Sequence, residues 1–285
     1  RIMILIDYSA IAIGNIVTQK LDPDENLIRH MILNSIRLYR KKFHKKYGEI
    51  VLAVDAGGNW RKEVFPQYKA NRKTSRDSDP EYWAEVFRLI DMVKKEIEEN
   101  FPYKVIKIHG CEADDIIGTL CEHTQEFGQN EPVMIVSADK DFAQLQKYSN
   151  VEQFSPMTKR PIVEKDPHRN LFEHLCKGDG GDGVPNILSP DDVFVTEGTR
   201  QTPMRKKRID ELYNAKDLQS AMTTEEYRNF QRNKKMIDLS STPDHLKQEI
   251  INRYVNGEVA QKGKIMNYFI KHRCKHLIEE LGDFT

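Results

Sequence analysis

Cysteine is scarce in this sequence, and the segments typical of membrane or secreted proteins are missing. The 285 residues include four cysteines, none of them in a C-x-x-C pair, and no N-x-Ser/Thr glycosylation site. These absences favour free thiols in a reducing compartment and argue against a zinc knuckle or a disulfide framework. No apolar run approaches the roughly 18 residues of a transmembrane helix, and the opening stretch RIMILID is too short for a signal peptide. We expect a cytoplasmic protein without a membrane role.

The sequence also lacks an excess of charge of either sign, because 44 Lys and Arg balance 44 Asp and Glu. The basic residues are nevertheless unevenly spread. Residues 29–76 contain thirteen Lys and Arg against three acidic residues, and residues 200–208 contain five basic residues and no acid. Such segregation indicates either a surface for a polyanion or solvated helix faces. The charge pattern alone does not separate the two interpretations.

Three short apolar runs, each ending in Asp, form the framework of the first half of the chain. They are IMILID at 2–7, IVLAVD at 50–55 and VMIVSAD at 133–139. Short runs rich in Val and Ile are typical of strands that are buried on both faces of a parallel sheet. Alternation with helices predicts an α/β fold, with a fourth strand at 103–108 and helices at 26–47, 80–100 and 112–127. Because Arg1 directly precedes an apolar strand, we also expect residues before it.

After about residue 159 the pattern changes to helices without strands. The expected helices cover 170–177, 205–214, 224–237, 242–256 and 263–281. A proline-containing stretch over 186–203 is expected to be a loop. The sequence therefore predicts two domains, an α/β core over 1–159 and a smaller helical lobe over 160–285.

Acidic residues follow three of the predicted strands. Asp7, Asp55 and Asp139 each stand at the carboxyl end of a strand, which is the edge where open parallel sheets bind ligands. A single Asp at such a position is often a helix cap. Three that meet at one edge indicate a site instead.

Three more acidic groups accompany these strand ends. They are G-C-E-A-D-D, S-A-D-K-D-F and K-G-D-G-G-D-G, which supply Glu112, Asp114, Asp115, Asp141, Asp179 and Asp182. So many carboxylates at one sheet edge would repel each other unless some are protonated or cations neutralise them. A ligand set of carboxylates alone suits Mg²⁺ or Mn²⁺. Two such ions about 4 Å apart could clamp both oxygens of a phosphodiester during hydrolysis.

Other motifs give weaker or competing interpretations. Residues 178–183 match G-x-G-x-x-G, but they follow a helix and contain two Asp that would repel a pyrophosphate. The D-x-D formed by Asp139 and Asp141 after a strand is also typical of aspartyl phosphatases, although Ala143 stands where such enzymes usually carry Thr or Val. A phosphatase therefore remains an alternative, and it predicts turnover of small phosphate monoesters.

Taken in order, the acidic motifs resemble the flap endonuclease and 5′-nuclease family. The likeness rests on Asp7, Asp55, E-A-D-D, S-A-D-K-D-F-x-Q-L and K-G-D-x-x-D, with Y-K-x-x-R between the second and third. Further stretches, among them W-R-K-E-V-F-P-Q-Y-K-A-N-R and G-K-I-M-N-Y-F-I-K, extend it over nearly the whole chain, towards phage members of the family. The resemblance implies a PIN-like nuclease core, a helical arch at about 60–80 and a helical lobe with a helix-hairpin-helix-like element.

The resemblance further implies two Mg²⁺ ions, for which Mn²⁺ can substitute. Asp7, Asp55, Asp114 and Asp139, with Glu112, would surround the first ion, and Asp141, Asp179 and Asp182 the second. Asp115 matches the pattern too. Lys69 and Arg72 match the basic pair of the family and would polarise the scissile phosphate. Nucleic acid would meet Arg61, Tyr68, Lys69, Arg72, Lys73, Arg76 and the run Arg205, Lys206, Lys207 and Arg208, with Tyr68 stacking on a base.

The activity that this resemblance implies is that of a structure-specific 5′ nuclease, acting as 5′-to-3′ exonuclease, flap endonuclease and ribonuclease H. Its substrates would be 5′ flaps, nicked duplex DNA and RNA primers in RNA–DNA hybrids during DNA replication. Further expectations are a monomer, possible contacts with a single-strand binding protein and a sliding clamp, and the cytoplasm of a host cell if the chain is phage-encoded. The alternative is a nucleic-acid-binding module of the same fold that has lost catalysis.

Overall fold

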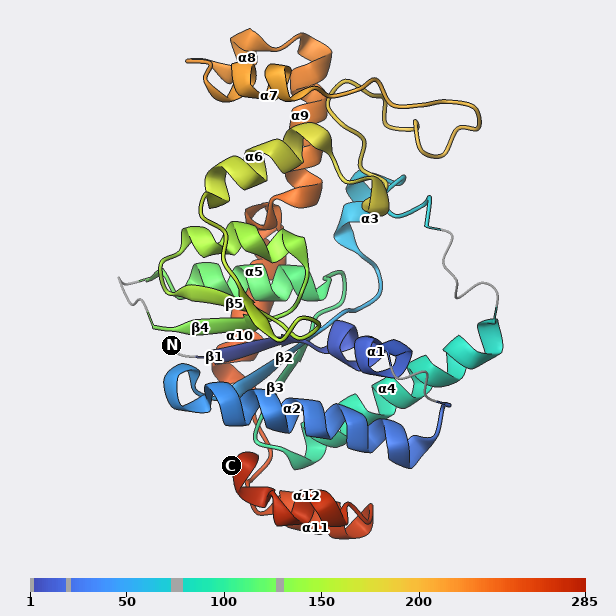
Figure 1. Cartoon of the computed structure of the whole chain (residues 1–285), viewed down its shortest axis with the longest axis vertical. Helices are drawn as coiled ribbons and strands as arrows, with labels where there is room; N and C mark the ends of the chain where they lie inside the picture. Colours follow the sequence, from blue (N-terminus) through green and yellow to red (C-terminus); the bar gives the residue numbers. More distant parts are fainter. Residues whose placement is uncertain (1–2, 19–21, 73–78, 127–130) are drawn as a thin grey trace.

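The protein is built around a six-stranded sheet in a computed structural model that describes residues 3–18, 22–72, 79–126 and 131–285. The strand order is β3-β2-β1-β4-β5-β6, and β1 to β5 are parallel while β6 is antiparallel to β5 (Figure 1). The strands are β1 (Met3–Asp7), β2 (Ile50–Val54), β3 (Lys104–Lys107), β4 (Val133–Val136), β5 (Val151–Ser155) and β6 (Arg160–Ile162).

Side chains of the central strands alternate between two hydrophobic cores. Ile4 and Ile6 of β1 face one core, and Met3 and Leu5 face the other. The first core contains residues of α1 (Tyr8–Thr18), α2 (Glu25–Tyr47) and α4 (Pro80–Asn100), and the second contains residues of α5 (Ala113–His123) and α10 (Asp244–Asn256). The sheet is therefore covered by helices on both faces, as the predicted α/β fold requires.

Local signals explain where the predicted helices begin and end. Asp24 caps α2, and Gly48 follows its last residue with a positive φ of 80°. Asp79 caps α4, and Pro80 occupies its first turn. Three parts of the core were not predicted. They are α1, which starts directly after Asp7, the 3-10 helix η3 (Lys140–Lys147), and the β5–β6 pair at the sheet edge.

Beyond the sheet, the helices of the second half divide into two groups in space (Figure 1). One group lies on the side of α5 and has its own core with Leu175, Ile209 and Phe230; it contains α6 (Pro167–Lys177), α7 (Lys206–Tyr213), α8 (Leu218–Ala221) and α9 (Thr224–Ile237). The other group is α11 (Lys264–Lys271) and α12 (Lys275–Glu279), which joins the core beneath α2 and α4 through Phe269 and Leu277. The single helix predicted over 263–281 is wrong, because Arg273 breaks it with a φ of 55°.

The connection between α6 and α7 differs from the expected helix-hairpin-helix-like element. Residues 178–205 contain turns and only the short 3-10 helix η4 (Gly180–Asp182), so α6 and α7 are joined by a long irregular segment. Among the described residues, no helix is long and apolar enough to cross a membrane.

Several cations of the basic segment 29–76 are internal rather than on a binding surface. Arg29 is 1% exposed and pairs with Glu96, with Nε at 2.7 Å from the carboxylate. Arg37 pairs with Asp283, and Arg40 pairs with Glu49. These three arginines tie α2 to its surroundings, and part of the charge excess therefore stabilises the fold.

Candidate active site

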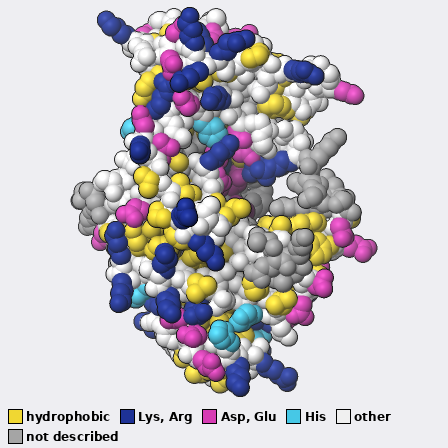
Figure 2. Space-filling model, in the orientation of Figure 1, with side chains coloured by type: hydrophobic (Ala, Val, Ile, Leu, Met, Phe, Trp, Pro, Cys, Tyr) yellow, Lys and Arg dark blue, Asp and Glu magenta, His cyan; other side chains and the backbone are white. Residues whose placement is uncertain are grey.

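The carboxyl ends of β1, β2 and β4 bring the predicted acidic residues to one edge of the sheet. Asp7 ends β1, Asp55 follows β2, and Asp139 comes three residues after β4. Figure 2 shows acidic side chains in a hollow between the upper helices and the sheet, with Lys and Arg around it. Part of this cleft is a cavity of about 510 Å³, whose lining includes Asp55, Lys69 and Glu112. The order β2-β1-β4 makes this edge the ligand-binding position of an open parallel sheet.

The centre of the cleft is a group of carboxylates that form no ion pair with a Lys or Arg among the described residues. One ligand atom each of Asp114, Asp139 and Asp141 lies within 4.8 Å of the others. Burial, followed by the charges of Asp139 and Glu112, raises the pKa of Asp114 well above its usual value. Burial and the charge of Asp55 raise the pKa of Asp7 to about 7. Crowded carboxylates of this kind need protons or cations, so the residues present fit oxygen-ligated divalent ions.

Glu112 lies in a cationic environment at the rim of the same cleft. Its carboxylate accepts hydrogen bonds from Lys69 Nζ at 2.8 Å and from the Tyr68 hydroxyl at 2.9 Å, and Asn59 contacts it as well. Burial opposes its ionisation, but Lys69 and Arg61 outweigh burial and lower the pKa of Glu112 to about 2. Glu112 is therefore a fixed anion that holds Lys69 at the site.

The glycine-rich loop after α6 supplies two further carboxylates to the cleft, those of Asp179 and Asp182. Arg72 pairs with Asp182 at 2.7 Å, and the Lys69 backbone N–H donates to the Asp182 carbonyl at 2.7 Å. Lys69 has a φ of 58°, a backbone conformation that residues other than glycine seldom adopt. The hydrogen bond to Asp182 holds the turn in this conformation against the loop. The predicted basic pair Lys69 and Arg72 thus lies beside the acidic residues.

Asp115 and Arg61 do not belong to the exposed site. Asp115 is fully buried, and both of its oxygens accept bonds from the Arg61 guanidinium, at 2.8 and 2.9 Å. Trp60 and Thr242 also donate to Asp115. Arg61 is 1% exposed and cannot reach a nucleic acid in this structure. The prediction of Arg61 as a nucleic-acid contact is therefore wrong. Asp115 forms a buried ion pair with Arg61.

Tyr68 was predicted to stack on a base, but it is 4% exposed and packs in the core of the upper helices. That prediction is wrong for this structure, since its ring is covered and its hydroxyl is bound to Glu112. Lys73 and Arg76, predicted in the arch, lie outside the described residues. The described part of the expected arch consists of α3 (Trp60–Val64) and the turns that follow it.

The four residues of the basic run at the start of α7 differ in exposure and in their contacts. Arg205, Lys206 and Lys207 are exposed. Arg208 instead donates to the Ala221 carbonyl at 2.9 Å and pairs with Glu226, so part of its charge is used within the lobe. The nucleic-acid contact predicted for this run stays a prediction for the three exposed residues.

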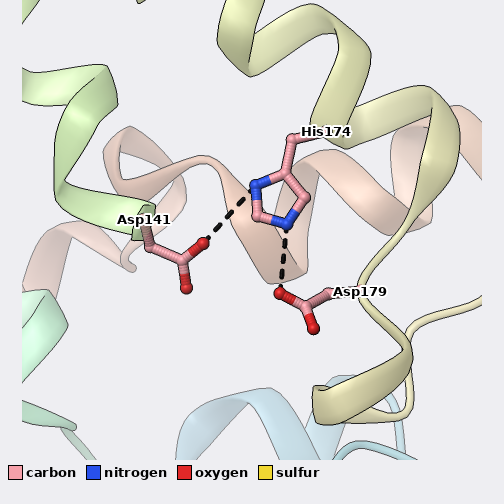
Figure 3. A group of neighbouring side chains, drawn as sticks. All are labelled: Asp141, His174 and Asp179. Carbon is pink, nitrogen blue, oxygen red and sulfur yellow. Dashed lines mark hydrogen bonds and ion pairs between the residues drawn. The ribbon is translucent and has the colours of Figure 1, made fainter. Parts of the chain in front are cut away.

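His174, on α6, is a residue that the sequence did not mark. Its Nε2 lies 3.0 Å from Asp179 Oδ2 and its Nδ1 lies 3.4 Å from Asp141 Oδ1 (Figure 3). It belongs to no metal-binding motif in the sequence, and only its position five residues before Asp179 connects it with the glycine-rich loop.

Comparisons with known proteins identify the family to which this chain belongs. Residues 5–171 match the family model of the 5′-3′ exonuclease N-terminal resolvase-like domain, which is more than half of the chain. The chain belongs to the 5′-3′ exonuclease family. As a member of this family it is a 5′ nuclease, and residues 166–284 match the model of the T4 RNase H C-terminal domain.

Individual relatives agree with this membership. Ribonuclease H of Enterobacteria phage T4 is 32% identical over 98% of this chain and 95% of its own. The exonuclease of Escherichia phage T7 is 33% identical over 61% of this chain and 58% of its own. The phage T5 D15 protein, crystallised with metal ions, shares the fold with a TM-score of 0.62 at 17% identity, over 88% of this chain and 97% of that one. The likeness to phage members that the motifs indicated is therefore confirmed.

Proposed function

We propose that the cleft is a two-metal active site that hydrolyses phosphodiesters in 5′ flaps, nicked duplex DNA and RNA primers of RNA–DNA hybrids during DNA replication. One observation carries the proposal. Carboxylates from three strand ends, the start of α5 and the glycine-rich loop lie close enough in one cleft to influence each other's charge, and Lys69 and Arg72 lie beside them.

The residues present suit two Mg²⁺ ions, with Mn²⁺ as a substitute. Asp7, Asp55, Asp114 and Asp139, with Glu112, would hold one ion, and Asp141, Asp179 and Asp182 would hold the other. When bound, such ions lower the pKa of an attacking water and neutralise the charge that develops on the leaving 3′ oxygen. Products would carry 5′-phosphates.

Lys69 and Arg72 would bind the scissile phosphate beside the carboxylates. Each is now paired with an acidic residue, Lys69 with Glu112 and Arg72 with Asp182. A phosphate oxygen can replace either partner, because it offers the same anionic acceptor to the same donor. Binding of the substrate would then exchange an internal ion pair for one that stabilises the transition state.

Recognition would depend on structure and backbone rather than on base sequence. Arg205, Lys206 and Lys207 are exposed on the upper lobe and offer ionic contacts to phosphates, which carry no sequence information. The D15 flap endonuclease of phage T5, which has the same fold with a TM-score of 0.60 at 17% identity over 88% of this chain and 96% of that one, is known in complex with DNA and metal ions. Action as a monomer in the cytoplasm of a host cell, with contacts to a single-strand binding protein and a sliding clamp, belongs to the same proposal.

A labelled 5′-flap oligonucleotide tests the proposal and its alternatives together. Incubation with Mg²⁺ should release the flap with a 5′-phosphate on the shortened strand, and EDTA should stop the reaction. A chain that binds the flap but leaves it intact in Mg²⁺ and in Mn²⁺ would support the inactive binding module instead. Hydrolysis of a small phosphate monoester with no cleavage of the flap would support the phosphatase.

A further inference from the structure

His174 occupies a position in the cleft that an all-carboxylate metal site does not explain. The side chain reaches from α6 between Asp141, which follows β4, and Asp179, which follows α6 (Figure 3). One ligand atom each of Asp141, His174 and Asp179 lies within 4.8 Å of the others. Ligand atoms around an ion with bonds of roughly 2.1 Å are about 3 Å apart at right angles and about 4 Å apart when opposite. The three side chains are therefore spaced closely enough to share one ion.

The two ring nitrogens of His174 have different contacts. Nε2 lies 3.0 Å from Asp179 Oδ2, which is hydrogen-bond distance, whereas Nδ1 lies 3.4 Å from Asp141 Oδ1. In a neutral imidazole only one nitrogen carries a proton. When Nε2 donates to Asp179, the lone pair of Nδ1 faces Asp141.

Asp141 Oδ1 is a buried oxygen that accepts no hydrogen bond from the described residues. A buried oxygen without a hydrogen-bond donor is costly, and in the tautomer that donates from Nε2 this oxygen faces the lone pair of Nδ1. Two electron-pair donors that face each other at this distance, Nδ1 and Asp141 Oδ1, can bind one metal ion between them. Histidine ligands commonly donate their second ring N–H to a carboxylate, which is the relation that His174 has with Asp179.

We infer that His174 Nδ1 and Asp141 Oδ1 are ligands of the second divalent ion, and that Asp179, which the proposed function placed among the ligands of this ion, orients the imidazole instead. The inference rests on the proposed function and adds to it. A nitrogen ligand gives this position a preference that carboxylates alone do not give, because imidazole suits transition metals such as Zn²⁺, Fe²⁺ and Ni²⁺ better than it suits Mg²⁺. The second position is therefore selective for a transition metal, while the group of Asp114 and Asp139 remains a pure oxygen site.

Pulsed electron paramagnetic resonance of the full chain loaded with Mn²⁺ tests this without measuring activity. The electron spin echo of bound Mn²⁺ should show modulation from a directly coordinated ¹⁴N nucleus, and ¹⁵N-histidine labelling should replace it with the ¹⁵N pattern. Mn²⁺ that binds in the cleft without any nitrogen modulation would overturn the inference.

Two variants locate the signal. His174→Gln should lose the nitrogen modulation and bind Mn²⁺ at least about 10-fold more weakly at one of the two positions, with a smaller change for Mg²⁺. His168→Gln, an exposed position on the same helix, should keep both the signal and the affinity. Equal Mn²⁺ affinity for His174→Gln and the unaltered chain would contradict the inference.

Failure of the inference and failure of the proposed function give different results. If the flap is cleaved in Mg²⁺ and cleavage is lost in Asp139→Asn, the nuclease site stands whatever the nitrogen signal shows. If Mn²⁺ shows the His174 nitrogen signal but the flap is never cleaved, the ligand assignment stands and the reaction does not.

Discussion

Asp114 and Asp115 are neighbours in the sequence, yet they lie in opposite electrostatic surroundings. Asp115 points into the protein, where Arg61 binds both of its oxygens and Trp60 and Thr242 complete its hydrogen bonds. Asp114 points into the cleft, where its nearest charges are other carboxylates and where its pKa is raised by burial and by Asp139. The first carboxylate holds α3 against α5, and the second repels its neighbours.

The contrast separates acidic residues that stabilise the fold from those that form a site. A buried ion pair with every hydrogen bond satisfied is a structural element. A group of carboxylates with raised pKa values and no cation costs folding energy, and such groups cluster at functional sites. Variants on the two sides of this comparison should therefore have opposite effects on stability and activity.

Replacing an unpaired carboxylate should give the largest effect on the reaction. Asp139→Asn removes one charge from the repelling group, and cleavage of the 5′ flap should fall on the order of 10³-fold or more, since metal ions supply several kcal/mol of transition-state stabilisation. Binding of the flap, measured by fluorescence anisotropy, should stay largely intact. Full cleavage by this variant would remove Asp139 from the site.

Replacing the cation of the buried pair should instead cost stability. Arg61→Met leaves Asp115 buried without its partner, which should lower the free energy of unfolding by about 3–5 kcal/mol in a urea titration. Arg88→Met, which breaks the exposed pair of Arg88 with Glu85 on α4, is the matched control and should cost much less, because solvent screens an exposed pair. Similar losses for the two variants would show that the Arg61–Asp115 pair is not a structural element.

Lys69 belongs to both kinds of surrounding that the comparison separates. It forms an ion pair with Glu112, and it also lines the cleft. Lys69→Ala should reduce the single-turnover rate by roughly 10² if its charge moves to the scissile phosphate. Lys62→Ala, at another lysine that lines the same cavity, should change the rate much less. An unchanged rate in Lys69→Ala would leave Lys69 as a partner of Glu112 only.

The smallest effect is expected for the exposed cations of the upper lobe. Lys206→Ala should weaken flap binding and reduce the slope of log affinity against log salt by about 1, with no change in the single-turnover rate. Lys275→Ala, on α12 at the other end of the molecule, should leave the slope unchanged (Figure 1). Equal slopes for the two variants would exclude α7 from the nucleic-acid surface.

The sequence predicted the parts of the site that depend on strand ends. Asp7, Asp55 and Asp139 could be placed because parallel strands present their carboxyl ends at one edge, and the apolar runs mark where the strands end. Asp115 and Arg61 could not be separated from the site in this way. Whether a side chain at the start of α5 points inward or outward depends on packing against Trp60 and Thr242, which lie far away in the sequence.

His174 and the β5–β6 pair were missed for a related reason. His174 meets Asp141 only when α6 packs beside the segment after β4, and no local spacing records that contact. The β5 and β6 strands contain Glu152, Gln153 and Arg160, so they lack the apolar runs by which the central strands were recognised.

Anomalous diffraction from a crystal of the full chain soaked in Mn²⁺ tests the central claim most directly. The account predicts two anomalous peaks in the cleft, one beside Asp114 and Asp139 and one between Asp141 and His174. If the protein cleaves 5′ flaps in Mn²⁺ in solution but its crystal shows no Mn²⁺ at these carboxylates, the account is contradicted.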